Sequence, residues 1–158
     1  MARARWVRTS DGVERQLDAM VNRTKQLPAY LQRVVYPQYQ KAQIARWQSE
    51  NASEGNPWPA LNDEYAKWKR RKFAGYDGGG NVMMIRTGDL SQSAMGRKKD
   101  GIIKVITTTG ITIAINDSVI PYAKYAAVKR PFMEFGSATT SLILDGVTRY
   151  LMTGKDAS

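Results

Sequence analysis

The side chains that most often perform catalysis or bind metal are missing from this sequence, because its 158 residues include neither histidine nor cysteine. Histidine is the commonest general base near neutral pH and the commonest metal ligand. Without cysteine there is no disulfide, no thiolate nucleophile and no cysteine metal site, which fits folding in a reducing cytosol. Catalysis would have to rest on carboxylates, lysine or tyrosine.

These remaining residue types form no catalytic arrangement. The glycine run Gly78–Gly80 lacks the preceding strand and the following Gly-Lys-Ser/Thr that a phosphate loop needs. Asp63 and Glu64 are adjacent, so on a helix they point in different directions and suit a helix start better than a metal site. The spacing of the serines nominates no serine–lysine pair. We therefore expect no catalytic residue, no metal site, no cofactor and no small-molecule substrate, and hence a protein that is not an enzyme.

The charge balance favours polyanionic partners. Lysine and arginine number 24 against 14 acidic residues, for a formal net charge of +10. Such an excess attracts nucleic acid through counterion release rather than through sequence reading. The alternative is a surface that stays soluble or that meets an acidic protein neighbour, and composition leaves both interpretations open.

The densest basic segment surrounds Trp68. Its basic residues are Lys67, Lys69, Arg70, Arg71 and Lys72, and a smaller cluster follows at Arg97, Lys98 and Lys99. These residues could follow a phosphate backbone, with Trp68 available for stacking, or dock onto a neighbouring protein. In the alternative interpretation they form a solvated rim while Trp68 faces the core beside Tyr65. The helical spacing of Tyr65 and Trp68 favours the core position for the tryptophan and leaves the role of the basic residues open.

A long helical segment is expected over residues 11–50. Apolar residues recur there at three- and four-residue steps, which predicts one buried stripe. Pro28 and Pro37 each remove a backbone donor, so we expect kinks or breaks at these points. The stripe is longer than a small core needs, and part of it is expected to pack on a neighbouring subunit. Its members are Val13, Leu17, Met20, Thr24, Leu27, Leu31, Val34 and Val35, continued by Tyr36, Tyr39, Ile44 and Trp47.

After a loop over 51–61, two short helices are predicted. Asn62 is placed to cap the first helix, which carries Tyr65 and Trp68. Thr87 is expected to cap the second, which extends to about Met95.

From residue 101 the apolar period changes from 3.6 to 2, which predicts a β-hairpin over 102–116 with its turn at Thr109-Gly110. A poorer extended stretch follows at 130–135. A last helix is expected from Ser137, with one apolar face formed by Ile143, Leu144, Val147, Tyr150 and Leu151. The expected fold class is α+β: a long N-terminal helical segment (1–50) and a C-terminal helix packed on a small, mainly antiparallel sheet, with 51–158 as the α+β core of one domain overall.

No stretch approaches the roughly 18 apolar residues of a membrane span, and the basic N-terminus leads into no apolar run. We therefore expect neither a membrane span nor a secretory signal.

Two segments carry motifs that recur together. Asn56–Leu61 is followed by Tyr65 and Lys69, and Met84–Ser93 reads Met-Ile-Arg-Thr-Gly-Asp-Leu-Ser-Gln-Ser. The first is similar to the W-x-P/A-L…Y-x-x-x-K segment, and the second matches the L-x-R-T-G-x-L-x-x-S pattern, of the tail-completion (virion morphogenesis) proteins of tailed bacteriophages, which this sequence resembles. A hairpin, a Tyr-Ala step, Arg-Pro-Phe and an amphipathic helix then follow, as in the family. The matching residues are Trp58, Leu61, Trp68, Arg86, Thr87, Gly88, Leu90, Ser93, Arg130, Pro131 and Phe132.

These motif positions are expected to be architectural. Gly88 permits a tight helix entry, and Arg130-Pro131 forces an extended chain before Phe132, which can bury its ring. One segment departs from the family: a His-x-x-Gly stretch common in its members is replaced here by residues 124–129, Lys-Tyr-Ala-Ala-Val-Lys.

The resemblance implies a structural virion protein at the head–tail junction, assembled in the host cytoplasm. It implies a homo-oligomeric ring, with six copies expected, that contacts neighbouring neck and tail proteins and lets double-stranded DNA pass without sequence preference. The alternative is a non-specific nucleic-acid-binding protein that acts as a monomer or dimer. Ring assembly separates the first hypothesis from the second, whereas a steep salt dependence of DNA affinity in a free monomer favours the second.

Overall fold

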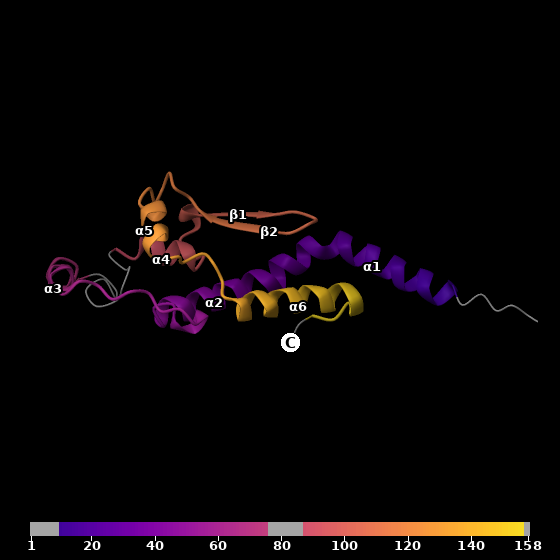
Figure 1. The fold of residues 1–158 in the computed structure, drawn as a ribbon. Coiled ribbons are helices and arrows are strands. Elements are labelled where there is room, and N and C mark those ends of the chain that lie inside the picture. Colours follow the sequence, from indigo (N-terminus) through magenta and orange to yellow (C-terminus); the bar gives the residue numbers. More distant parts are fainter. Residues whose placement is uncertain (1–9, 76–86, 157–158) are drawn as a thin grey trace, which may run out of the picture.

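The computed structural model describes residues 10–75 and 87–156. In chain order the elements are α1 (Ser10–Tyr30), a π-helical turn (Leu31–Val35), α2 (Tyr36–Gln48), a 3-10 turn (Ala52–Glu54), α3 (Asp63–Lys72), α4 (Asp89–Ala94), a second 3-10 turn (Lys99–Gly101), β1 (Ile102–Ile106), β2 (Ile111–Ile115), α5 (Ala123–Lys129) and α6 (Ser137–Thr153). The arrangement is elongated, with α3 at one end and the start of α1 at the other (Figure 1). The helices pack with a small antiparallel hairpin, which confirms the α+β fold class.

The long helical segment is one continuous run that bends between α1 and α2 (Figure 1). At the bend the Tyr36 N–H bonds to the Leu31 carbonyl, five residues back, as in a π turn. Pro37 follows at once and has no N–H to offer, so the predicted distortion near this proline is confirmed. At Pro28 the helix does not break, since α1 continues through that residue to Tyr30, and a kink there stays a prediction.

The β-hairpin forms as predicted. Ile102 pairs with Ile115 and Ile106 with Ile111 in an antiparallel register. The Thr107 N–H donates to the Gly110 carbonyl at 2.8 Å, which closes the turn. The stretch 130–135 joins no sheet in the described part of the chain, because the only paired strands there are β1 and β2.

Two apolar cores lie along the molecule. One joins the end of α1 and the π turn to α6 and one side of the hairpin, and there the Tyr30 and Tyr150 rings stack 4.1 Å apart. The other joins the end of α2 to α4, α5 and the segment before α6. The buried residues of the first core are Leu27, Tyr30, Leu31, Val35 and Tyr150, and those of the second are Trp47, Trp58, Leu90, Ala94, Met95, Ile120, Ala123 and Phe132.

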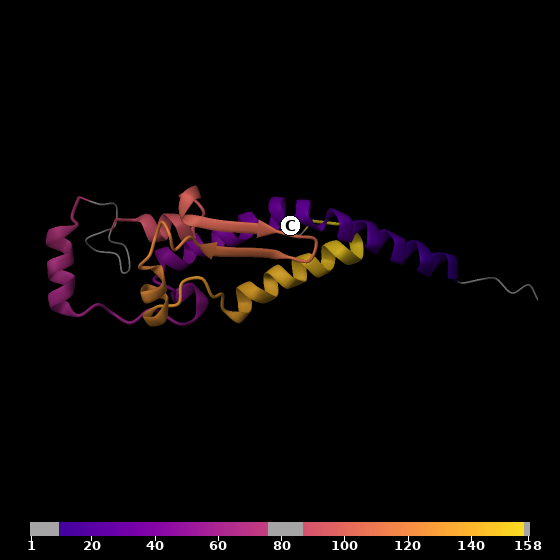
Figure 2. The ribbon, with the colours of Figure 1, turned by 90° about the horizontal axis from the view of Figure 1, so that it is seen from above.

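Helix α6 begins at Ser137, as predicted, and buries or half-buries four of the five residues of its expected apolar face. Leu144 is the exception, because its side chain is 59% exposed. Helix α6 packs on α1 over a narrow stripe (Figure 2), and Leu144 lies beside that stripe rather than on it.

The start of α4 differs from the prediction. Gly88, with a φ of 87°, occupies the N-cap position, and no side chain caps the helix there. The Thr87 hydroxyl instead donates to the Asp89 carboxylate at 2.7 Å. Only glycine adopts this left-handed backbone without strain, so backbone conformation rather than side-chain capping starts the helix.

Candidate functional site

The basic segment forms α3, which lies at one end of the molecule, beyond α4 and α5 (Figures 1 and 2). Asn62 caps this helix as predicted, because its side-chain oxygen accepts a hydrogen bond from the Glu64 N–H at 3.0 Å. Asp63 and Glu64 follow in the first turn, where acidic side chains interact favourably with the helix dipole. Most of the basic residues lie in the last turn, at the C-terminal end of the helix.

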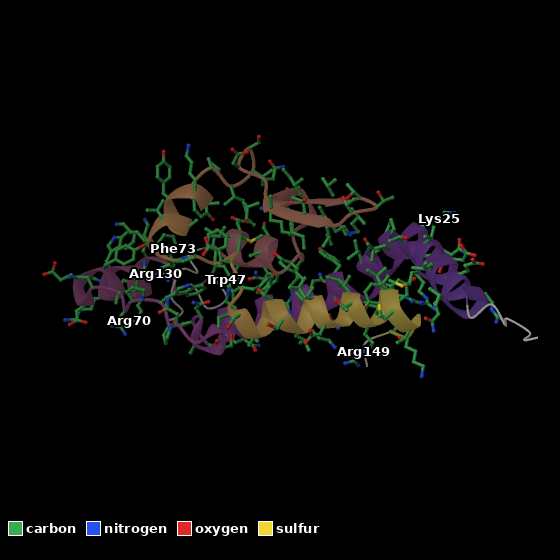
Figure 3. The ribbon with its side chains drawn as sticks, turned by 45° about the vertical axis from the view of Figure 1, so that its right-hand side comes forward. Lys25, Trp47, Arg70, Phe73, Arg130 and Arg149 are labelled. Carbon is green, nitrogen blue, oxygen red and sulfur yellow. The ribbon has the colours of Figure 1, made fainter. Side chains whose placement is uncertain are left out.

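Three of these basic residues share the outer side of α3. Lys67, Arg70 and Arg71 are exposed and together line one shallow depression. Their spacing of three and four residues places them on one helix face, which we call the cationic face. Figure 3 shows Arg70 at this end of the molecule. Such a surface can bind phosphate groups or an acidic protein.

Lys69 does not belong to that face. Its side chain is only 2% exposed, and burial lowers its pKa while the carboxylate of Glu50 opposes the shift and Arg130 adds to it. The expectation that Lys69 contacts DNA or a partner is therefore wrong, because a buried ammonium group cannot reach an external phosphate. Lys72 is exposed, but it follows Trp68 by one helical turn and so lies on a different side from the cationic face.

Trp68 lies beside Tyr65, as expected, but it does not occupy the core position that its helical spacing favoured, and its stacking on nucleic acid stays a prediction. Its side chain is 42% exposed, so it is not a core residue. Its ring stacks on Tyr65 with centroids 5.4 Å apart and meets the Phe73 ring edge-on at 5.6 Å. Tyr65 covers one face of the indole, and Phe73, the residue that follows α3, meets the indole edge-on. Trp68 therefore packs the middle of α3 against the residue at its C-terminal end.

The second basic cluster is divided in the same way. The Lys98 ammonium bonds to the Asp89 carboxylate at 2.6 Å, whereas Arg97 and Lys99 are exposed. Hydrogen bonds from Lys98 and then Thr87 lower the pKa of Asp89. Lys98 thus connects the loop after α4 to the start of that helix and is not a free cation for a partner.

A cleft of about 520 Å³ separates α3 from α4 and α5. Arg130 lies on its wall and donates a hydrogen bond to the Pro59 carbonyl at 2.8 Å (Figure 3). The acidic group in the cleft, Asp89, is already paired, and Lys69 and Arg130 are the basic ones. The lining residues are Leu61, Tyr65, Lys69, Thr87, Asp89, Leu90, Tyr122, Ala126 and Arg130. Within the cleft the Thr87 hydroxyl donates to the Asp89 carboxylate, which also accepts a hydrogen bond from Lys98.

Several of the motif residues pack in the second core or at its edge. The Trp58 indole N–H donates to the Pro131 carbonyl at 3.0 Å, and the Trp47 ring lies 5.1 Å from Trp58 and 6.0 Å from Phe132. Leu90 and Ser93 are buried, and Leu61 packs against the same core from its edge. Arg86 and Gly78–Gly80 lie outside the described residues.

In the described ranges, large apolar side chains are exposed on five parts of the molecule. They lie on the first half of α1, on α3, on the hairpin, on and before α5, and on α6. The exposed residues are Val13, Leu17, Val21, Tyr65, Trp68, Ile103, Val105, Val119, Tyr122, Tyr125, Val128, Leu142, Leu144 and Met152. Those of α5 were missed because no helix was predicted there, although the alanine-rich segment 123–129 favours one.

Within the described ranges, no group of acidic side chains could hold a metal ion. No helix in the same ranges combines the length and apolar character that crossing a bilayer requires. No family model and no curated protein matches the sequence, and no solved structure matches the fold.

Proposed function

We propose that this protein is a structural subunit of a homo-oligomeric ring in a tailed bacteriophage, placed at the head–tail junction as a tail-completion protein. The ring encloses a passage for double-stranded DNA and contacts neighbouring neck and tail proteins. The order of motifs from Trp58 to Phe132 supports the family.

The observation that carries the ring is the distribution of exposed apolar side chains. Monomeric proteins expose scattered apolar residues, but contiguous apolar patches mark contact surfaces. Here they lie on α1, the hairpin, α5 and α6, which are different sides of an elongated molecule. A subunit of a ring needs two different complementary surfaces, one for each neighbour, and this chain has unpartnered apolar groups at both ends.

The cationic face supports a passage for DNA. Lys67, Arg70 and Arg71 gather on one exposed helix side, with no acidic residue between positions 67 and 72. Contacts from lysine and arginine to phosphate are independent of base sequence, as a conduit requires, since the genome must slide past them.

The same face supports the second candidate function, a non-specific nucleic-acid-binding protein that acts as a monomer or dimer. Three exposed cations that neutralise about three phosphates would give a salt dependence with a logarithmic slope of roughly −3. A purified chain that stays monomeric yet binds duplex DNA with such a slope would favour this alternative over the ring.

The mass of the purified chain tests the ring directly. We expect closed particles with a central hole in negative-stain electron microscopy and a single mass equal to a small whole number of subunits. A protein that remains monomeric at all accessible concentrations, with and without DNA, would contradict the proposal.

The role of the cationic face is tested by Arg70→Glu with Arg71→Glu. Reversing two exposed charges usually changes stability by less than about 0.5 kcal/mol, so the fold should be spared. If the face lines a DNA passage, virions built with this variant should join heads to tails but lose or retain DNA abnormally. If it docks onto an acidic neighbour, joined particles should not form. Lys25→Glu with Arg149→Glu, two exposed basic residues away from α3 (Figure 3), is the matched control.

A further inference from the structure

The first half of α1 projects beyond the hairpin and beyond α6 (Figures 1 and 2). On this projecting part Val13, Leu17 and Val21 recur every four residues, and each is more than half exposed. Glu14 and Asp18 are also exposed and lie one position further around the helix. The projecting part therefore presents an aliphatic row beside an acidic row, which we call the α1 arm face (Val13, Glu14, Leu17, Asp18 and Val21).

Helix α5 presents the complementary pattern. Val128 is 86% exposed and Tyr125 is 68% exposed, and these are the two most exposed large apolar residues in the described ranges. Lys124 and Lys129 are exposed on either side of them, and the Lys124 ammonium lies 5.1 Å from the centre of the Tyr125 ring. With 3.6 residues per turn, these four side chains occupy one continuous side of the helix, which we call the α5 face.

We propose that the α1 arm face of one copy docks on the α5 face of the next copy. This inference rests on the proposed ring and names its subunit contact. The aliphatic row would cover Tyr125 and Val128, while Glu14 and Asp18 would meet Lys124 and Lys129. Apolar burial supplies the attraction, and opposite charges at the rim select the orientation and speed the encounter.

The contact joins two copies because one chain cannot make it. The start of α1 and α5 lie in opposite halves of the elongated molecule in both views (Figures 1 and 2). In such a contact one copy keeps its α5 face free and the other keeps its α1 arm face free. A head-to-tail contact of this kind repeats until the rotation between neighbours closes a ring. Neither face includes a residue of the cationic face of α3.

Charge reversal on each face tests the pairing. The first variant is Glu14→Lys with Asp18→Lys, and the second is Lys124→Glu with Lys129→Glu. Each variant alone should associate at least about tenfold more weakly than the wild-type chain in sedimentation velocity, because like charges then face each other. An equimolar mixture of the two should assemble again, since each reversed face finds an opposite charge on the other variant.

Controls separate this contact from general effects of charge and from misfolding. Asp117→Lys with Asp145→Lys reverses two exposed carboxylates outside both faces and should leave assembly unchanged. The circular dichroism spectrum and thermal midpoint of each monomer should match those of the wild-type chain.

Three results would overturn the pairing. If both variants assemble like the wild-type chain, the ring uses other surfaces, and the proposed function stands without this contact. If each variant loses assembly but the mixture does not restore it, the two faces do not meet each other. If the wild-type chain itself forms no oligomer, both the contact and the proposed ring fail.

Discussion

Lys67, Lys69, Arg70 and Arg71 are neighbours on one helix, yet burial gives them different chemistry. Three are exposed and can meet a partner, whereas Lys69 is covered and its pKa is lowered. Lys69 and Arg70 are adjacent in the sequence, yet the first side chain is buried and the second is exposed, because successive residues of a helix point in different directions. The local density of basic residues in a sequence therefore overstates the charge that a partner can reach.

The lowered pKa of Lys69 has a defined effect on stability. Between its folded pKa and the ordinary value of 10.5, the unfolded chain holds a proton that the folded chain has released. Unfolding then takes up protons, so the contribution of Lys69 to stability should rise as pH increases through this window and level off above it.

Urea unfolding of the wild-type chain and of Lys69→Met from pH 7 to pH 10.5 measures this effect. We expect the free energy of unfolding of the wild-type chain to increase relative to that of Lys69→Met as pH rises. Lys67→Met removes an exposed lysine from the same helix and should keep the pH dependence of the wild-type chain. A stability difference for Lys69→Met that is constant across the range would contradict the lowered pKa.

Phe132 provides a second prediction at the residue scale. Its side chain is 2% exposed and packs against Trp47 with ring centroids 6.0 Å apart. Phe132→Ala should lower the free energy of unfolding by about 3–5 kcal/mol, the usual cost of removing a buried aromatic ring. Chemical denaturation measures this, with Leu142→Ala on the exposed side of α6 as the control. A Phe132→Ala chain that unfolds like the wild-type chain but fails to assemble would place the ring at an interface instead.

At the scale of elements, Glu54 connects three parts of the chain. Its carboxylate accepts hydrogen bonds from the Gly136 N–H at 2.6 Å and from the Thr139 hydroxyl at 3.1 Å, at the start of α6. The same carboxylate lies 3.9 Å from the buried Arg46 guanidinium of α2. Burial lowers the pKa of Arg46, and Glu54 is the largest influence that opposes the shift. This cluster anchors the N-terminal end of α6 against α2.

Glu54→Ala should therefore destabilise the fold strongly. It leaves the Arg46 charge buried without its carboxylate and removes both hydrogen bonds at the start of α6, which should cost about 3–5 kcal/mol. Asp156→Ala is the matched control, because it removes an ion pair with Arg33 that is 3.0 Å long but exposed. That pair should contribute less than about 1 kcal/mol. Similar losses in the two variants, measured by thermal or urea unfolding, would show that the buried pair has no special role.

At the scale of the whole molecule, the two ends differ in how they are supported. The end of α1 and the end of α2 contribute buried residues to the two cores, whereas Val13, Leu17 and Val21 at the start of α1 are exposed. Helical segments with few buried contacts open at low free energy and exchange their amide hydrogens quickly.

Hydrogen exchange should report this difference and its loss on assembly. Amides at positions 12–22 should exchange faster than those of α2 in the monomer and become protected in the oligomer. Peptides from α2 serve as the internal control, since their protection should be the same in both states. Equal protection of positions 12–22 in monomer and oligomer would mean that the projecting part of α1 makes no subunit contact.

The sequence by itself determined the features that depend on neighbours along the chain. The helices within residues 11–50, the Asn62 cap, the hairpin with its turn at Thr109-Gly110 and the start of α6 at Ser137 were all predicted correctly. Each depends on side-chain type, backbone preference or a hydrogen bond within a few residues. Such local signals survive in any tertiary arrangement.

Only the tertiary structure decided which side of each element is covered. It buried Lys69, exposed Leu144 and the start of the α1 stripe, and placed Tyr65 over Trp68. A helical period shows that an apolar side exists, but not whether a distant segment reaches it, because that depends on where other elements pack. Thr87 has the chemistry of a cap, yet the left-handed backbone at Gly88 starts the helix instead. The candidate surfaces arise where the local pattern offers an apolar or basic side and no other element of the described chain covers it.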